Sequence, residues 1–291
     1  MVYFRPLIIC LAVVLIISCS EDEKQDVPPV DTEDGSWVIY SPLKWGHDGY
    51  PVTGNYCKVY SDEASMDLKL QCLDFADSMF GEVLAQFNFD NMGDLILPPE
   101  NDKINVYINA GHPENIAYAY WGTIFITVRT TVINTSMYEY LFKHELTHEF
   151  EFMIEGTVNL GTDVWFRESI AIYAGGGFNR INTIEDLEEW ISANEDFPGQ
   201  GNPVMIHAWE DFPEGSDIDG YYWYAFDITM RYLLDPMGLN KSCQDVLSLF
   251  YDIRAGVTFE IAFQNNFGIG LKTFEEEFYD RIRNYLIIQP E

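Results

Sequence analysis

The stretch YLFKHELTHEFEF, residues 140–152, carries two histidines four positions apart in a run rich in aromatic and apolar residues. On an α-helix each residue turns by about 100°, so His144 and His148 lie about 40° apart and one turn apart along the axis. Both imidazoles can therefore reach one ion, and Glu145, about 100° from His144, can reach a water molecule on that ion. The stretch predicts a helix that either binds a metal ion or only packs its aromatic residues in a core.

A third metal ligand is needed, and the stretch DVWFRESIAIYAGGG, residues 163–177, supplies a candidate. Glu168 stands 20 positions after His148. Its helical neighbours three and four positions away are all apolar, namely Val164, Trp165, Ala171 and Ile172. A carboxylate on such a face needs a cation or several hydrogen bonds. The alternative is an exposed glutamate, or one paired with Arg167 or Lys143. Histidine suits Zn²⁺, and three protein ligands leave the fourth tetrahedral position to water, so we expect one Zn²⁺ ion here.

The spacing of apolar residues elsewhere predicts an α+β fold. A helix is expected over residues 61–87, followed by a small sheet made from INVYINA (104–110) and from two β-rich runs in IAYAYWGTIFITVRT (116–130) that join near Trp121-Gly122. Further helices are expected at residues 137–154, 164–174, 184–193, 221–234, 242–254, 259–266 and 274–287. Residues 36–155 would form an N-terminal lobe with a small mixed sheet and helices, ending in the HELTH helix. Residues 156–291 would form a mainly helical C-terminal lobe, with that helix between the two.

The N-terminus resembles the leader of a bacterial lipoprotein. Residues 1–18 contain the apolar run LIICLAVVLII, which is too short to span a membrane comfortably but suits a signal peptide. Ser18 precedes Cys19 as in a lipobox, which implies cleavage before Cys19 and a lipid on its thiol. Residues 19–35 are acidic and read as a flexible tether. The alternatives are an ordinary signal peptide or an uncleaved anchor, and an acidic run after the lipid is typical of lipoproteins displayed on an outer membrane or cell surface.

The net charge argues against a nucleic-acid partner, and the spacing of the cysteines argues against a disulfide framework or a cysteine metal site. The formal net charge of −31 repels phosphate backbones, so we expect no nucleic-acid partner. Beyond the leader and Cys19, the chain has Cys57, Cys72 and Cys243, whose spacing supports neither a disulfide framework nor a cysteine metal site. Cys72 and Cys243 fall in helical patterns and are expected to be small core residues. The sequence predicts no particular oligomeric state.

The HELTH motif, with Glu168 in WFRESIAIY twenty positions on, resembles the gluzincin metallopeptidases. The runs YYWYAFDITMRYLLDPMG (221–238) and GVTFEIAFQNNFGIGLKTFEEEF (256–278) resemble the peptidase-MA-like group within them, so the resemblance covers roughly residues 104–286. It implies a zincin-like, two-lobed metallopeptidase in which His144, His148 and Glu168 bind zinc. Glu145 would be the general base of peptide-bond hydrolysis. Ser169 departs from the family pattern, which usually has glycine at this position.

The resemblance also implies residues that act on the substrate. A donor must stabilise the oxyanion, and related enzymes often use a tyrosine on a later helix, so Tyr224 is the first candidate and Tyr222 the second, with His207 as an alternative. The run IAYAYWG, residues 116–122, is expected to be an edge strand to which a peptide adds as a further strand. Its substrate-binding residues would be Tyr118, Ala119, Tyr120 and Trp121. The competing interpretation is an ordinary half-buried strand.

These patterns favour a lipid-anchored zinc metallopeptidase that acts on extracellular proteins or glycoproteins. Endopeptidase activity is preferred to aminopeptidase activity, because the Gly-x-Met-x-Asn strand of the aminopeptidase branch has no match here. One alternative is a catalytically silent, zinc-containing surface binding lipoprotein, although such a protein has no need of Glu145. Another is a structural or glycan-associated lipoprotein in which the motif is a coincidence.

Overall fold

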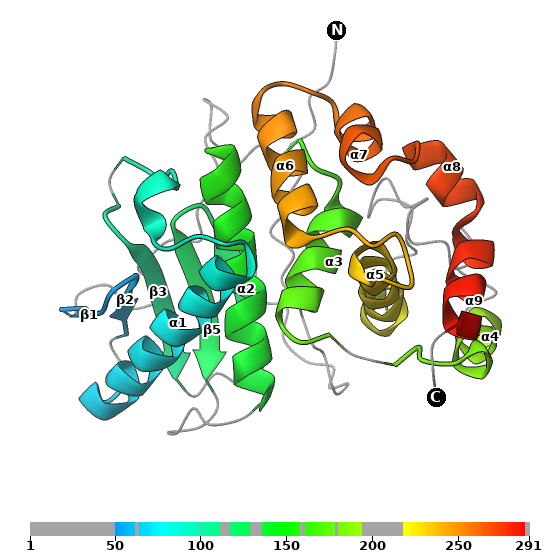
Figure 1. The fold of residues 1–291 in the computed structure, drawn as a ribbon. Coiled ribbons are helices and arrows are strands. Elements are labelled where there is room, and N and C mark those ends of the chain that lie inside the picture. Colours follow the sequence, from blue (N-terminus) through cyan, green and yellow to red (C-terminus); the bar gives the residue numbers. More distant parts are fainter. Residues whose placement is uncertain are drawn as a thin grey trace, which may run out of the picture.

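The computed structural model describes residues 50–61, 64–99, 101–110, 117–128, 136–157, 161–177, 180–193 and 218–288. Within them the protein is α+β, with a five-stranded mixed sheet and a larger set of helices (Figure 1). The strands are β1 (Val52–Thr53), β2 (Cys57–Tyr60), β3 (Ile104–Ala110), β4 (Ala117–Tyr120) and β5 (Thr123–Val128). The helices are α1 (Met66–Gln86), the short 3₁₀ helix η2 (Met92–Asp94), α2 (Ser136–Glu155), α3 (Val164–Ala174), α4 (Ile184–Ala193), α5 (Ile218–Leu234), α6 (Cys243–Arg254), α7 (Phe259–Phe267), α8 (Leu271–Glu276) and α9 (Phe278–Ile288). The α+β prediction is confirmed.

The sheet has the strand order β1-β2-β3-β5-β4. Strands β2, β3 and β5 are parallel, whereas β1 and β4 run antiparallel to their neighbours. A two-residue turn at Trp121-Gly122 joins β4 to β5, and Gly122 adopts φ +80°, a conformation that glycine tolerates best. The predicted pair of strands joined at this turn is confirmed, and so is the position of β4 at an edge of the sheet.

Strands β1 and β2 were not predicted from the sequence. They contain two and four residues, too few for an alternating pattern to stand out. Their position depends on α1, where the carboxylate of Asp77 accepts the backbone N–H groups of Tyr56 and Cys57 at 3.0 and 2.9 Å. This is a tertiary interaction between residues about twenty positions apart, so a local pattern cannot reveal it.

Helices α1 and α2 pack side by side against the sheet. α1 contacts β1 and β2, α2 contacts β4 and β5, and the two helices contact each other. Aromatic pairs fill the space between them, with ring centroids 5.4 Å apart for Phe75 and Phe142 and 4.5 Å apart for Phe87 and Phe150. α2 is thereby held along one side by the sheet and α1.

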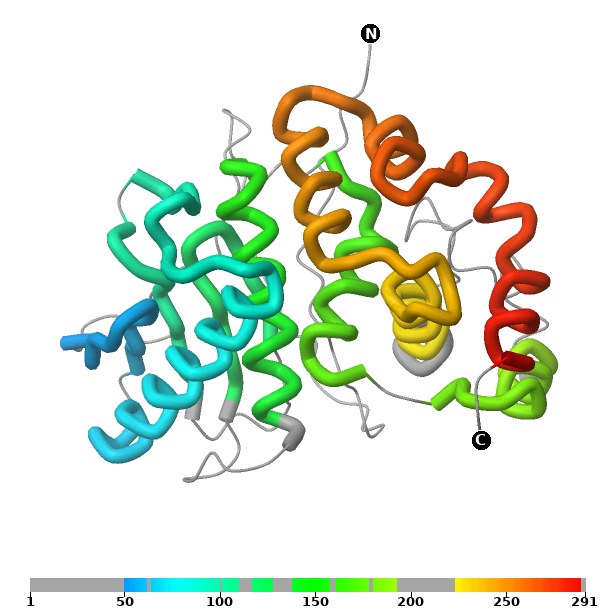
Figure 2. The backbone as a smooth tube through the Cα atoms, viewed as in Figure 1, coloured from blue at the N-terminus to red at the C-terminus, as the bar shows by residue number. Residues whose placement is uncertain are grey.

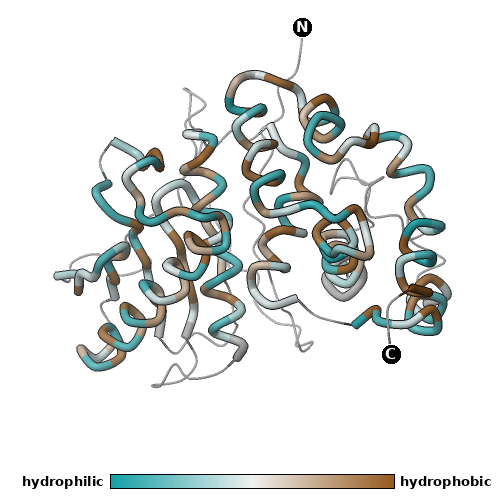
Figure 3. The backbone as a smooth tube through the Cα atoms, viewed as in Figure 1, coloured by the Kyte–Doolittle hydropathy of each residue, from teal (hydrophilic) through white to brown (hydrophobic). Residues whose placement is uncertain are grey.

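Helices α3 to α9 lie on the other side of α2 from the sheet (Figures 1 and 2). α3 and α6 contact α2, and α5 contacts α3. Trp165 and Phe166 of α3 lie in an aromatic core with Phe263 and Phe274, which come from the late helices. α6 alternates between hydrophilic and hydrophobic residues along its length, as a helix with one buried face does (Figure 3). α2 therefore lies between the sheet and the later helices.

The prediction of one continuous helix near the C-terminus is wrong. Residues 274–287 were expected to form a single helix, but the structure has α8 and α9, separated at Glu277. Phe274, Phe278 and Ile282 are all buried and follow one another at four-residue spacing across the break. The apolar period continues through the interruption, which explains why periodicity missed it.

The described residues include three cysteines, and the prediction of a small core residue is confirmed for Cys72 but not for Cys243. Cys57, Cys72 and Cys243 are all free thiols, with Cys72 buried in α1 and Cys243 partly buried against the core at the start of α6. Among the described residues, no helix is both long enough and apolar enough to cross a membrane. The predicted signal peptide, Cys19 and the acidic tether lie outside the described residues, so the lipid anchor stays a prediction.

Candidate metal centre

The HELTH motif lies in the middle of α2, where the helix is enclosed on all sides. His144 has no exposed surface, and every residue from His144 to Glu155 is buried. A helix buried all round occurs where it is sandwiched between other layers, as α2 is between the sheet and α3. The histidines are therefore withdrawn from bulk solvent by the packing of α2.

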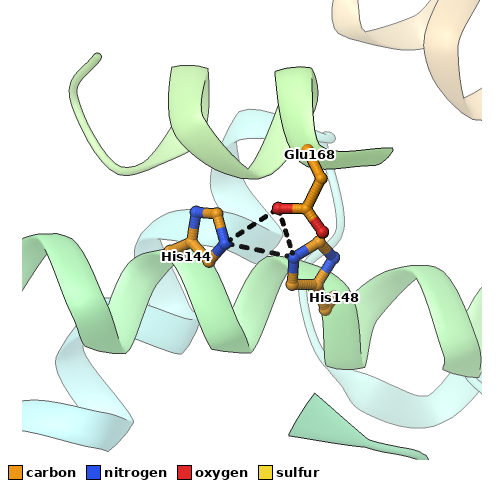
Figure 4. A group of neighbouring side chains, drawn as sticks. All are labelled: His144, His148 and Glu168. Carbon is orange, nitrogen blue, oxygen red and sulfur yellow. Dashed lines mark hydrogen bonds and ion pairs between the residues drawn. The ribbon is translucent and has the colours of Figure 1, made fainter. Parts of the chain in front are cut away.

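Three donor atoms from α2 and α3 converge on one point (Figure 4). The Nε2 atoms of His144 and His148 lie 3.2 Å apart. Oε2 of Glu168 lies 3.3 Å from the first of these nitrogens and 3.6 Å from the second. Two ligand atoms at about 2.05 Å from a tetrahedral ion lie about 3.3 Å apart, so the triangle has the size that such an ion requires. His144, His148 and Glu168 thus form a buried group that can hold a metal ion, as the sequence predicts.

The alternative interpretations of Glu168, as an exposed side chain or as the partner of Arg167 or Lys143, are wrong. The Glu168 side chain is only 3% exposed, and Lys143 pairs with Glu82 of α1. Arg167 is also buried, but no hydrogen bond or ion pair joins it to Glu168 among the described residues. The neighbours of the Glu168 carboxylate are the two imidazoles.

Electrostatics couple the three side chains. Burial alone would raise the pKa of Glu168, but the charge and hydrogen bonds of the two histidines outweigh it and hold that pKa well below its usual range. Burial lowers the pKa of His144, whereas the pKa of His148 is raised because Glu168 and Glu151 outweigh the effect of burial. A positive charge at this position, on an imidazole or on a bound cation, stabilises the buried carboxylates.

The distal ring nitrogens of the histidines have different partners. Nδ1 of His148 lies 3.3 Å from Oε2 of Glu151, and Nδ1 of His144 lies 3.4 Å from the hydroxyl of Tyr140. Trp223 of α5 packs edge-on against the His144 ring, with centroids 5.6 Å apart. These three residues were not predicted. Helical spacing could have indicated two of them, since Tyr140 stands four positions before His144 and Glu151 three positions after His148.

Glu145, the predicted general base, is buried beside this group. Its side chain is 1% exposed, and its Oε1 has no hydrogen-bond partner among the residues that the structure describes. Burial, aided by the charge of Glu168 and opposed by that of His148, raises the pKa of Glu145 to about 8. The chain therefore holds a carboxylate with an unused acceptor next to the metal-ligand group.

A second buried carboxylate joins α2 to the predicted substrate strand. Oε2 of Glu149 accepts the backbone N–H of Gly122 at 2.5 Å, and its pKa is raised by burial despite the hydrogen bonds from the turn. Nε1 of Trp121 donates to the carbonyl of Ile96 at 2.8 Å, which holds the other residue of the turn. The position of Glu149, next to His148, places the β4–β5 turn against the metal-binding helix. The sequence contained no signal for this contact.

The predicted substrate-binding residues lie on the edge strand and its turn. In β4, Ala117 and Ala119 are buried, whereas Tyr118 and Tyr120 are partly exposed. The ring of Tyr118 stacks on Phe125 with centroids 4.5 Å apart. A half-buried edge strand is therefore confirmed, and contact with a peptide stays a prediction.

The oxyanion donor is also still a prediction. Tyr224 is partly buried in α5 and packs against the core, next to the Trp223 that contacts His144. The side chain of Tyr222 and the whole of His207 lie outside the described residues. Ser169, at the position where the gluzincin pattern has glycine, is buried, and its hydroxyl donates to the carbonyl of Trp165 at 2.6 Å.

No protein-family model matches the sequence, and no curated protein matches it either. The likeness to gluzincins is therefore limited to the motifs described above. Any function has to be argued from the chemistry of His144, His148, Glu168 and their neighbours.

Proposed function

We propose that the protein is a zinc-dependent peptidase of the gluzincin type. The observation that carries the proposal is the convergence of three donor atoms at 3.2, 3.3 and 3.6 Å from one another, beside the buried carboxylate of Glu145. The ligands account for a metal ion, and Glu145 supplies a base that a purely structural site does not need. Glu145 directly follows the ligand His144 on α2.

The donor set favours zinc over the other common ions. Calcium and magnesium prefer oxygen ligands, and two imidazole nitrogens make a poor site for either. Imidazole also suits copper, iron and nickel, and the HExxH arrangement of two histidines around a glutamate on one helix favours zinc among these metals. Two histidines and one carboxylate in a tetrahedral arrangement are typical of catalytic zinc sites, which keep a fourth position for water.

Glu145 is the general base of the proposed reaction. Zinc, when bound, lowers the pKa of a water molecule to about 7 and polarises the carbonyl of a peptide bond. Glu145 accepts the proton of the attacking water and afterwards donates it to the leaving amine. Burial raises the pKa of Glu145 to about 8 without a metal ion, and the positive charge of a bound ion would lower that pKa and favour the carboxylate form that accepts a proton. The oxyanion would be stabilised by Tyr224 or Tyr222 of α5.

We propose that the peptide adds to β4 as a further strand and that cleavage is endoproteolytic. Among the described strands β4 lies at one edge of the sheet, and Glu149 holds the β4–β5 turn on the helix that carries the histidines. In this arrangement the peptide backbone would pair along Tyr118, Ala119 and Tyr120, with Trp121 at the turn. The position of α2 between the sheet and the later helices supports a zincin-like division into an N-terminal lobe, residues 36–155, and a C-terminal lobe, residues 156–291.

The proposal includes a location at the cell surface. Lipid on Cys19 and the acidic tether of residues 19–35 would hold the enzyme on an outer membrane or cell surface, facing extracellular proteins or glycoproteins. Palmitate labelling that is lost in Cys19→Ala supports this part. Unchanged labelling of that variant contradicts the anchor without touching the peptidase.

Digestion of a peptide library by the protein from Cys19 onward, with and without a chelator, tests the activity. We expect cleavage that stops with the chelator and returns with zinc, and Glu145→Gln should keep zinc but lose at least a thousandfold in rate. His144→Ala and Glu168→Ala should lose the metal. One bound zinc per chain without any cleavage would favour the silent binding lipoprotein. Preference for free-amine peptides over their N-terminally blocked twins would favour an aminopeptidase.

A further inference from the structure

Glu151 is a buried carboxylate that the reaction proposed above does not use. It lies on α2 three positions after His148, has no exposed surface, and places Oε2 3.3 Å from Nδ1 of that ring. We infer that Glu151 is a positioning residue of the metal centre, which holds the His148 ring and its proton so that Nε2 is free to bind the ion. This inference rests on the metal-binding part of the proposed function.

The tautomer of His148 is the first step of the argument. Nε2 points to the ion position and must offer a lone pair, so the single proton of the neutral ring has to be on Nδ1. A proton there needs an acceptor because the ring is buried. Oε2 of Glu151 is within reach, and its charge also makes the ring a stronger ligand.

The two histidines differ in the partner of Nδ1, the ring nitrogen that faces away from the ion position. The distal nitrogen of His144 faces the neutral hydroxyl of Tyr140 at 3.4 Å, a distance at the limit of a hydrogen bond. The partner of His148 is a carboxylate, and charge-assisted hydrogen bonds are roughly twice as strong as neutral ones. His148 should therefore be the more firmly oriented of the two ligands.

A counter-charge for Glu151 comes from α3. Burying a carboxylate is costly unless a cation or several hydrogen bonds compensate it. Arg167 is 4% exposed, its Nε and Nη2 make no hydrogen bond within the described residues, and its charge acts on Glu151. Because Arg167 precedes Glu168 directly, α3 supplies both a metal ligand and a positive charge that acts on Glu151.

Glu155 provides a matched control on the same helix. It stands four positions after Glu151, is also buried, and also interacts with Arg167. Its hydrogen bonds go elsewhere, from the hydroxyl of Thr162 at 2.8 Å and the N–H of Gly161 at 3.3 Å. Changes at Glu155 thus report the effect of removing a buried acid from α2 without touching a metal ligand.

Zinc affinity, measured by competition with a chromophoric chelator, tests the inference. We expect Glu151→Met to bind zinc about 100-fold more weakly than the unchanged protein and Glu151→Gln about 10-fold more weakly, because glutamine keeps an acceptor but no charge. Glu155→Met and Glu155→Gln should change the free energy of unfolding and leave zinc affinity within about twofold. The visible spectrum of bound Co²⁺ should change in the Glu151 variants only.

The possible outcomes are distinct. If the unchanged protein binds one zinc ion and Glu151→Met binds it equally well, the inference is wrong and the peptidase proposal stands. Equal losses at Glu151 and Glu155 would mean that both act through packing, which also overturns it. If Glu151→Met does not fold, Glu151→Gln decides, and an unchanged affinity and Co²⁺ spectrum would refute the inference. A protein that binds no metal at all would refute both proposals.

Discussion

Glu155 gives a prediction whose size follows from the structure. Burial raises the pKa of Glu155 from 4.5 to about 7, against the opposing hydrogen bond from Thr162. The folded state therefore binds the proton more tightly than the unfolded chain, so stability is fully present below pH 4.5 and is lost as pH rises to about 7. One pKa unit corresponds to about 1.36 kcal/mol. Ionisation of the Glu155 carboxyl should therefore lower the free energy of unfolding by roughly 2.5 kcal/mol between pH 5 and pH 8.

Replacing Glu155 by glutamine imitates the protonated form and removes this titration. Urea unfolding of the metal-free protein at pH 5 and pH 8 should show that Glu155→Gln gains stability relative to the unchanged protein by about 2.5 kcal/mol over that interval. Any hydrogen bond lost to Thr162 or Gly161 shifts both values equally, so it cancels in the comparison. Glu139→Gln, exposed on the same helix, reports the effect of removing a surface charge. An equal difference between the two proteins at both pH values would refute the reasoning.

Three further predictions concern the metal, the turn and a buried thiol. Zinc at about 100 times its dissociation constant should stabilise the protein by about 2.7 kcal/mol, seen as a rise in Tm that His144→Ala abolishes. Gly122→Ala should destabilise it by at least about 1 kcal/mol in urea unfolding, because φ is +80° and the added Cβ would meet the Asn101 side chain at 2.4 Å. Cys72 should react with a thiol reagent only after denaturation, since burial raises its pKa to about 12; labelling of the native protein at that residue would contradict this.

Local patterns were sufficient for most of the helices. The predicted limits 164–174 and 184–193 agree with α3 and α4, and Ser242 proved to be the N-cap of α6 rather than its first residue. Its side chain and that of Asp245 cap each other's backbone, an interaction within four residues that the sequence displays directly. Periodicity failed where the same apolar spacing continued across a break, as at Glu277, and where a strand was very short, as in β1.

The residues of the candidate site likewise include some that local patterns predict and some that only tertiary contacts reveal. His144, Glu145 and His148 were predictable because one turn of helix fixes their relative directions. Glu168 was predictable from its apolar neighbours, since a carboxylate among them needs a cation. The roles of Glu149, Arg167 and Trp223 were not, because each depends on a contact with an element distant in the sequence.

By itself the sequence determined which side chains α2 and α3 carry and on which helical face they lie. Only the tertiary structure decided that the carboxylate of Glu168 stops 3.3 Å from Nε2 of His144, at the spacing a metal ion requires. That distance depends on how α3 is held against α2 by α5, α6 and the aromatic core around Trp165. Helical directions are set by backbone geometry within a few residues, whereas the separation of two helices is set by the side chains packed around them.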